Sequence, residues 1–197
     1  MSRPMSDTAH HKAQLRALAH HLRRLMPAGA GEAGSIAACA RLLALPELAE
    51  VRTVLGYAAM PAEIDPAPAL AALRERGVLV AYPRVCADRV LTLHVIDDPS
   101  ELVPGAFGIL EPPERAPTTG PAELDAVIVP GVAFDAACAR LGHGAGYYDR
   151  LLAALAPDVP LIALAFDEQI FGEVPREAHD IRMHVVVTPS AAYRRAD

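Results

Sequence analysis

Hydrophobic residues along the chain gather in short, nearly continuous runs separated by helical patterns. Five of these runs predict strands, at residues 51–59, 78–82, 126–129, 161–166 and 184–187. Because the runs are continuous rather than alternating, both faces of each strand should be buried, which is typical of a parallel sheet covered by helices. We therefore predict an α/β fold, a three-layer α/β/α domain with a mainly parallel sheet.

The first 26 residues contain the clearest helical pattern. A helix over residues 8–26 places Lys12 and Arg16, four residues apart, on one side. A separate apolar face is formed by Leu15, Leu18, Leu22 and Leu25.

Two further helices are predicted around the first strand. A loop over residues 27–34 leads to Ser35, a residue type that suits an N-cap, and the helix that follows runs to about Leu45. Another helix begins after Asp65 and Pro66 and closes at Gly77.

Two later segments show no buried-strand pattern. Residues 89–96 alternate between apolar and polar types, which predicts an edge strand or a hairpin. Residues 111–121 are rich in proline and are interpreted as a long surface connection. We expect one domain over residues 1–197, with residues 1–7 as a flexible tail.

Composition narrows the functional classes. With 197 residues and 52% hydrophobic content, the chain can bury a sizeable core. A net charge of −6 argues against broad binding to nucleic acid or to a membrane surface. The absence of a long apolar stretch and of a secretory pattern predicts a cytoplasmic protein. Three scattered cysteines, Cys39, Cys86 and Cys138, are expected to be reduced thiols that pack.

The strongest chemical candidate is a glycine-rich loop. Gly142, Gly144 and Gly146 alternate between Arg140 and Asp149, after one predicted strand and before a helical pattern. Glycine allows positive φ, so backbone N–H groups can turn toward one anion, while the arginine adds charge and the aspartate could hold a metal. This strand, loop and helix predict a phosphate site near the carboxyl ends of the strands. A glycine turn with a purely structural role fits the same residues.

In their order along the chain, several motifs together resemble the 5-formyltetrahydrofolate cyclo-ligase family, also called 5,10-methenyltetrahydrofolate synthetases. The matching segments are residues 12–16, 57–65, 82–85, 108–112, 129–135, 140–149, 165–169, 179–180 and 187–189. The resemblance implies closure of 5-formyltetrahydrofolate to 5,10-methenyltetrahydrofolate, with ATP converted to ADP and phosphate. It implies ATP as co-substrate and Mg²⁺ as metal, while the net charge leads us to expect no nucleic-acid or membrane partner. We favour a monomer.

The resemblance also assigns roles to residues. ATP would be held by Lys12, Arg16, Arg140, Leu141, Gly142, His143, Gly144, Ala145, Gly146, Tyr147 and Tyr148. The folate substrate would contact Ala58, Glu63 and Tyr147. Lys12, Arg140 and Tyr147 are the candidate catalytic residues, and Asp149 is the candidate metal ligand.

Two positions depart from the family pattern. His184 stands where many members carry an aspartate that binds the metal, and imidazole suits Mg²⁺ poorly, so we expect His184 to be structural. Water, ATP oxygens or Asp180 are then left to complete the metal's coordination. Ala145 replaces a lysine or glycine, which removes one phosphate contact where lysine would stand, and His143 is at a variable position.

Two other functions fit parts of the sequence. The glycine-rich turn superficially resembles the fingerprint of a nicotinamide-dependent dehydrogenase, although GxGxxG is absent and the glycines come late in the chain. A non-catalytic member that binds folate or nucleotide is the other alternative, suggested by the histidine at position 184.

Overall fold

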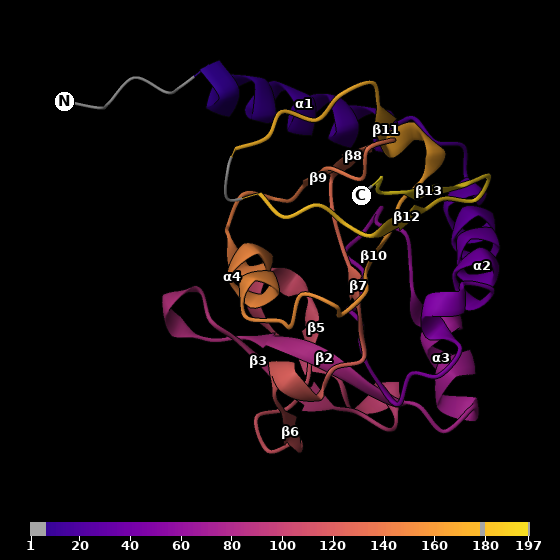
Figure 1. Ribbon diagram of the computed structural model, residues 1–197, viewed down its shortest axis with the longest axis vertical. Coiled ribbons are helices and arrows are strands. Elements are labelled where there is room, and N and C mark those ends of the chain that lie inside the picture. The colour runs from indigo at the N-terminus through magenta and orange to yellow at the C-terminus, as the bar shows by residue number, and fades with distance from the viewer. Residues whose placement is uncertain (1–6, 178–179, 197) are drawn as a thin grey trace.

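A mainly parallel sheet runs through the middle of the protein (Figure 1). The computed structural model describes residues 7–177 and 180–196, and eight strands within them form this sheet. Their order is β13 (Ala192–Arg194), β12 (Val185–Val187), β10 (Leu161–Leu164), β7 (Ala126–Val129), β1 (Thr53–Leu55), β2 (Leu79–Val85), β3 (Leu91–Val95) and β6 (Thr118–Thr119). The five strands from β12 to β2 are parallel, and antiparallel pairing adds β13 beside β12, β3 beside β2 and β6 beside β3. The predicted α/β class is confirmed.

The apolar runs of the sequence form the central strands. β7 has the predicted bounds, and every residue of β1, β7, β10 and β12 is buried. The run at residues 51–59 gives only the three residues of β1, because the chain leaves the sheet at Gly56 and continues toward a cavity. Continuous hydrophobicity thus marked strands whose two faces are both covered.

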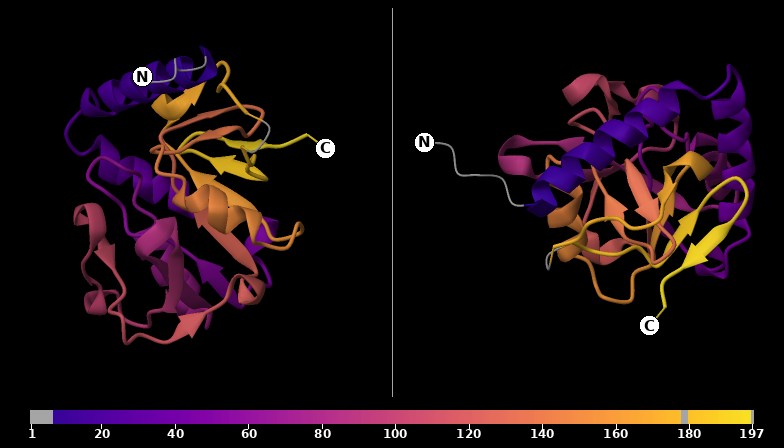
Figure 2. Two further views of the ribbon diagram at one scale, coloured as in Figure 1. Left: turned by 90° about the vertical axis from the view of Figure 1, so that its left-hand side faces the viewer. Right: turned by 90° about the horizontal axis from the view of Figure 1, so that it is seen from above.

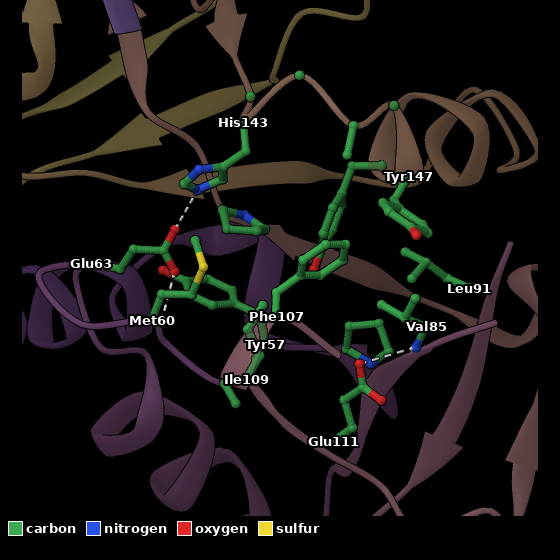
Figure 3. A pocket seen from close by; sticks show the side chains of 18 of the residues that line it. Tyr57, Met60, Glu63, Val85, Leu91, Phe107, Ile109, Glu111, His143 and Tyr147 are labelled. Carbon is green, nitrogen blue, oxygen red and sulfur yellow. Dashed lines mark hydrogen bonds and ion pairs between the residues drawn. The ribbon is translucent and has the colours of Figure 1, made fainter. Parts of the chain in front are cut away.

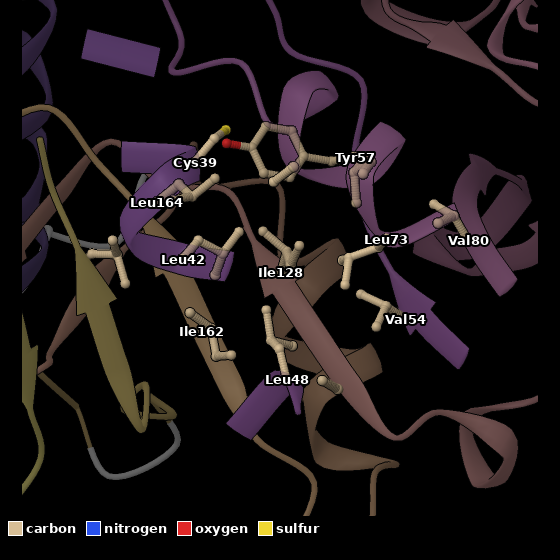
Figure 4. Close-up of a cluster of buried hydrophobic side chains, with 14 of the residues drawn as sticks. Cys39, Leu42, Leu48, Val54, Tyr57, Leu73, Val80, Ile128, Ile162 and Leu164 are labelled. Carbon is tan, nitrogen blue, oxygen red and sulfur yellow. The ribbon is translucent and has the colours of Figure 1, made fainter. Parts of the chain in front are cut away.

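Helices cover both faces of the sheet, as the predicted three layers require. α2 (Ala30–Leu43) and α3 (Ala67–Glu75) pack on one face, over a core that includes Leu42, Leu73 and Ile128 (Figure 4). α4 (Tyr147–Ala153) covers the opposite face, where Leu151 and Leu152 are buried (Figures 1 and 2). Truncating a large side chain of such a core to alanine costs about 2–5 kcal/mol.

The predicted start of α2 was wrong. The helix begins at Ala30, after Gly29 in a left-handed conformation with φ of 80°, and the expected N-cap Ser35 lies inside it. The Ser35 hydroxyl donates to the Gly31 carbonyl and accepts from the Asp65 backbone N–H, so its polarity joins α2 to the segment before α3. α3 itself follows Asp65 and Pro66 and ends before Gly77, as predicted.

α1 (Asp7–Arg24) lies apart from the main sheet, across a small sheet of β11 (Ile170–Phe171), β8 (Ala133–Asp135) and β9 (Arg140–Leu141) (Figure 2). The expected apolar face is wrong in part, because Leu18 and Leu25 are 47% and 65% exposed. The buried residues of the helix are Lys12, Ala19 and Arg23. The helix therefore turns part of its basic side toward the protein.

Three other expectations are corrected. The glycine loop does not follow β7 directly, because the β8–β9 hairpin lies between them. The proline-rich segment is more than a surface connection: it contains β6, and Glu111 at its start is buried in the hairpin of β4 (Val103–Pro104) and β5 (Leu110–Glu111). Residues 1–6 of the expected tail lie outside the described residues, and Asp7 already begins α1.

The strand order has one reversal that positions a site. β1 pairs with β2 on one side and with β7 on the other, so the chain builds the sheet outward in both directions from β1. In open parallel sheets, ligands bind at the carboxyl ends of the strands where the order reverses. Tyr57 and Pro130 follow the carboxyl ends of β1 and β7 and face the same cavity.

No helix of the described ranges is both long and apolar enough to cross a membrane.

Candidate active site

A cavity of about 380 Å³ opens at this reversal point (Figure 3). Nine of the ten residues from Arg140 to Asp149 line it, and only Leu141 does not, because its side chain is in the core beneath α1. The predicted folate residues Ala58 and Glu63 line it as well. The structure thus brings together two sets of candidate residues that are about 80 positions apart in sequence.

Much of the remaining cavity lining is apolar. It is formed by Met60, Pro83, Val85, Leu91, Phe107, Ile109 and Leu110. Phe107 is 71% exposed, has a φ of 58°, and meets the ring of Tyr147 edge-on at a centroid distance of 6.2 Å. An exposed aromatic ring at a cavity mouth is a ready surface for a flat ligand. Phe107 was not predicted as a site residue, although it directly precedes the matched segment 108–112.

The three glycines of the loop are needed for different reasons. Gly144 and Gly146 have φ of 97° and 78°, which other residues adopt only with strain. Gly142 has no such φ, but a Cβ there would lie 2.9 Å from Nη1 of Arg140. The predicted role of glycine in this loop therefore rests on conformation at two positions and on space at the third.

α1 carries a row of basic residues, two of which lie against the loop. Lys12, Arg16, His20 and Arg23 recur at helical spacing. Arg16 donates from Nε to the Gly142 carbonyl at 2.8 Å, and the His20 ring lies 5.8 Å from that of His143. The same spacing that singled out Lys12 and Arg16 extends to His20 and Arg23.

Lys12 does not line the cavity. Its Nζ lies 2.6 Å from Asp180 and 2.8 Å from Glu177. Burial opposes the charge of the ammonium, but hydrogen bonds and charge attraction from the two carboxylates outweigh it and raise the pKa of Lys12. Lys12 is therefore a fully charged group held at the end of the basic row.

Arg140 and Asp149 form an ion pair at the cavity wall. Nη2 of Arg140 donates to Oδ1 of Asp149 at 2.7 Å, and Nη1 donates to the Pro130 carbonyl. The arginine side chain is 5% exposed, whereas that of Asp149 is 43% exposed. Burial lowers the pKa of Arg140, while Asp149 and Tyr148 oppose that effect. Arg140 thus holds Asp149 in place from the protein side, and Asp149 is the member of the pair that is open to solvent.

Glu63 is the other carboxylate with a defined position. Its Oε2 accepts the Met60 backbone N–H at 2.9 Å, and its Oε1 lies 2.8 Å from Nε2 of His143 (Figure 3). The side chain is only 5% exposed. The turn after β1 and the glycine loop therefore meet at this carboxylate.

Two polar atoms of the cavity wall lack a hydrogen-bond partner within the described ranges. They are the Tyr148 hydroxyl and Nε of Arg140. Burial raises the pKa of Tyr148, so the hydroxyl keeps its proton as a potential donor. Buried polar groups without partners are uncommon, and they mark a place that a polar ligand could complete after a small shift.

The described residues contain no cluster of three or more His, Cys, Asp or Glu side chains that could hold a metal. Asp149 is a single solvent-open carboxylate beside the glycine loop, which fits a metal ion that arrives with a phosphate and keeps several waters. His184 accepts the Leu161 backbone N–H on Nδ1, in agreement with its expected structural role. Of the matched pair at residues 179–180, residue 179 lies outside the described residues, and Asp180 is paired with Lys12.

Comparison with known proteins gives consistent matches over most of the chain. A model of the 5-formyltetrahydrofolate cyclo-ligase family matches residues 8–189. The 5-formyltetrahydrofolate cyclo-ligase of Mycolicibacterium smegmatis is 37% identical over 70% of this chain and 74% of its own. That of Escherichia coli K12 is 33% identical over 87% of this chain and 96% of its own. The structure of Aquifex aeolicus 5,10-methenyltetrahydrofolate synthetase superposes with a TM-score of 0.79 at 32% identity, covering 94% of this chain and 93% of that one.

Proposed function

The chain belongs to the 5-formyltetrahydrofolate cyclo-ligase family, and we propose that the cavity between β1, β7 and the glycine loop is where it closes 5-formyltetrahydrofolate to 5,10-methenyltetrahydrofolate at the expense of ATP. The observation that supports this most is the joint lining of one cavity by Glu63 and by the loop from Gly142 to Asp149. Membership of a ligase family argues against the dehydrogenase alternative, and the relatives named as cyclo-ligases favour an active enzyme over a non-catalytic member.

The chemistry accounts for the need for ATP. N10 must attack the formyl carbon on N5, and the formyl oxygen must leave, but an oxide or hydroxide ion is a poor leaving group. Transfer of the γ-phosphoryl group to that oxygen breaks the bond to ADP and forms a carbon–oxygen–phosphorus link. When N10 attacks, the oxygen departs as phosphate, and N10 loses its proton. The protein's main tasks are to align two substrates and to neutralise moving negative charge.

The folate would lie along the apolar part of the cavity lining. Its pterin ring carries an amino group and a ring N–H, which suit the Glu63 carboxylate as acceptor. Ala58, at the end of β1, would pack beside the ring, and Tyr147 and Phe107 would border the plane of the folate at the cavity mouth. Burial of a flat aromatic ligand between such side chains is the usual design of a small-molecule site.

The triphosphate would lie along the glycine loop. The residues from Gly142 to Tyr148 line the cavity, and Arg16 of α1 donates to the Gly142 carbonyl. Neither Lys12 nor Arg16 lines the cavity, so each would turn from its present partner to reach the phosphates. Arg140 would act on the transferring group from beneath, while it also fixes Asp149. Local cations are required here, because the protein as a whole carries a net charge of −6.

Mg²⁺ fits this arrangement as an ion shared with ATP. Asp149 would hold it with one carboxylate oxygen, because its Oδ1 is taken by Arg140. When bound, the ion offsets charge on the phosphate oxygens. The chain's own part is to orient that carboxylate, through the buried guanidinium of Arg140.

We further infer that the enzyme works as a monomer in the cytoplasm, without nucleic-acid or membrane partners. Sedimentation at micromolar concentration tests the monomer: a stable dimer would refute it.

An isotope experiment tests the proposed reaction. 5-formyltetrahydrofolate carrying ¹⁸O in the formyl group is incubated with the protein, ATP and Mg²⁺, and both products are analysed. We expect absorbance of methenyltetrahydrofolate to rise in step with ADP, and the label to appear in inorganic phosphate. Product formation with unlabelled phosphate would overturn the phosphorylation step, and no product from folded protein with any divalent metal would overturn the activity.

A further inference from the structure

The contact between His143 and Glu63 joins the two substrate positions of the proposed site. His143 comes from the middle of the glycine loop, between Gly142 and Gly144, whereas Glu63 comes from the turn after β1. Their side chains meet at 2.8 Å between Nε2 and Oε1 (Figure 3). His143, from the loop that we expect to bind the phosphates, is thus hydrogen-bonded to Glu63, the carboxylate that we expect to bind the pterin.

In this state the carboxylate of Glu63 is closed to a ligand. Its side chain is 5% exposed, and each oxygen already has a donor, His143 on Oε1 and the Met60 backbone on Oε2. A pterin needs to bring an amino group and a ring N–H to the same carboxylate edge. Each oxygen could accept a second hydrogen bond, but with only 5% of the side chain exposed, an existing donor has to turn aside before both pterin donors can reach the carboxylate.

His143 is the donor that can move. The Met60 N–H belongs to the same short turn as Glu63, so its bond is local and costs little to keep. The His143 side chain is 35% exposed, and Gly144 beside it has a φ of 97° that allows backbone rearrangement. The His20 ring of α1 lies 5.8 Å from the His143 ring.

We propose that His143 is a positioning residue that couples folate binding to the conformation of the phosphate loop. In the free protein the His143 imidazole donates a hydrogen bond to the Glu63 carboxylate. The pterin's N–H donors displace it, and the displaced imidazole carries Gly142 and Gly144 with it toward the arrangement that receives the nucleotide. Each substrate then favours the loop conformation that the other requires, so the two bind with positive cooperativity. This inference rests on the proposed place of the pterin at Glu63.

Binding measurements without turnover test the coupling. Dissociation constants of 5-formyltetrahydrofolate are measured by calorimetry, with and without a non-hydrolysable ATP analogue and Mg²⁺. For the unaltered protein we expect the analogue to tighten folate binding about fivefold, which is at the lower end of usual coupling between sites. His143→Ala removes the competing donor, so folate alone should bind about five- to tenfold more tightly, which is less than a full charged hydrogen bond because the imidazole is partly solvated. In that variant the analogue should no longer change folate affinity.

Two further variants separate this role from a merely structural one. His143→Gln can still donate an N–H to Glu63 and should restore most of the coupling. His21→Ala removes an exposed histidine from α1, outside the cavity lining, and should behave like the unaltered protein. Thermal unfolding of each variant checks that the fold is retained.

The outcomes distinguish this inference from the proposed function. If His143→Ala binds folate as well as or more weakly than the unaltered protein, or keeps the coupling, His143 is not the coupling residue. Glu63→Gln should weaken folate binding in every background. If it does not, the pterin does not bind at Glu63, and the proposed folate position fails together with the coupling. Weak folate binding by Glu63→Gln with unchanged binding by His143→Ala overturns the coupling alone.

Discussion

Replacement of Asp149 separates catalysis from stability, because this residue serves both in the proposed account. Its Oδ1 accepts from Arg140 at 2.7 Å, while nearly half of its side chain is open to solvent. Asp149→Ala removes the acceptor and the negative charge together. Asp149→Asn keeps an oxygen that Arg140 can bond, but removes the charge that a metal or a cationic group would use.

The structure sets the size of each effect on stability. Asp149→Ala leaves a buried guanidinium short of a partner, which costs about 1–3 kcal/mol for a charged donor. Solvent reaches the pair from the Asp149 side, so we expect about 1–2 kcal/mol, or a fall in Tm of about 2–8 °C for a chain of this length. Asp149→Asn should cost less than about 1 kcal/mol. Both variants should lose about 100-fold in kcat, equivalent to about 2.7 kcal/mol of transition-state stabilisation.

Three measurements decide the outcome: Tm by scanning calorimetry, kcat from methenyltetrahydrofolate absorbance, and folate affinity without ATP. Folate affinity should stay within about twofold, because Asp149 is assigned to phosphate and metal rather than to the pterin. Asp158→Asn, at an exposed position outside the cavity lining, is the matched control. If Asp149→Asn turns over within about threefold of the unaltered enzyme, the assigned role is refuted. If folate affinity without ATP falls as much as kcat, Asp149 serves the folate instead.

Three other changes give distinct results. Lys12→Met should raise the KM for ATP about tenfold and leave folate binding without ATP unchanged. An unaltered KM in steady-state kinetics would mean that Lys12 only forms ion pairs with Asp180 and Glu177. Phe107→Ala should weaken folate binding by about 1–2 kcal/mol with little change in Tm, since the ring is 71% exposed; a large drop in Tm would show that the ring supports the fold. Burial lowers the pKa of His184 below 6.5, so the unfolded chain takes up its proton first, and stability is lost as pH falls through that range. His184→Asn keeps an acceptor for the Leu161 N–H without titrating, so denaturant unfolding should show a smaller loss between about pH 7.5 and about pH 5.5; equal losses would contradict this.

The strands were predictable because burial on both faces requires a continuous run of hydrophobic residues, which is visible in the local sequence. The run at residues 126–129 became β7 with the same bounds, and the positions around the glycine loop, Ala58 and Glu63 lie together at the cavity. The start of α2 was not predictable from Ser35, because that hydroxyl bonds within the helix and to the Asp65 backbone. A capping preference describes only a local competition for N–H groups, and tertiary bonds can override it.

The face of α1 shows a second limit. Leucine spacing favoured one side of the helix, but Lys12 and Arg23 are buried while Leu18 and Leu25 are exposed. Hydrophobic periodicity indicates an apolar face of a helix. It does not predict that basic side chains will contact a loop and carboxylates that lie far away in the sequence. For the same reason the contacts of Lys12 with residues 177 and 180, and of His143 with Glu63, follow only from the folded chain.

A crystal structure of the protein with 5-formyltetrahydrofolate, a non-hydrolysable ATP analogue and Mg²⁺ tests the central claim most directly, namely that one cavity holds both substrates. The account predicts the pterin amino group and ring N–H within hydrogen-bond distance of Glu63, the triphosphate along Gly142 to Gly146, and Asp149 beside the metal. A folate or triphosphate bound outside this cavity, or a pterin oriented away from Glu63, would contradict it.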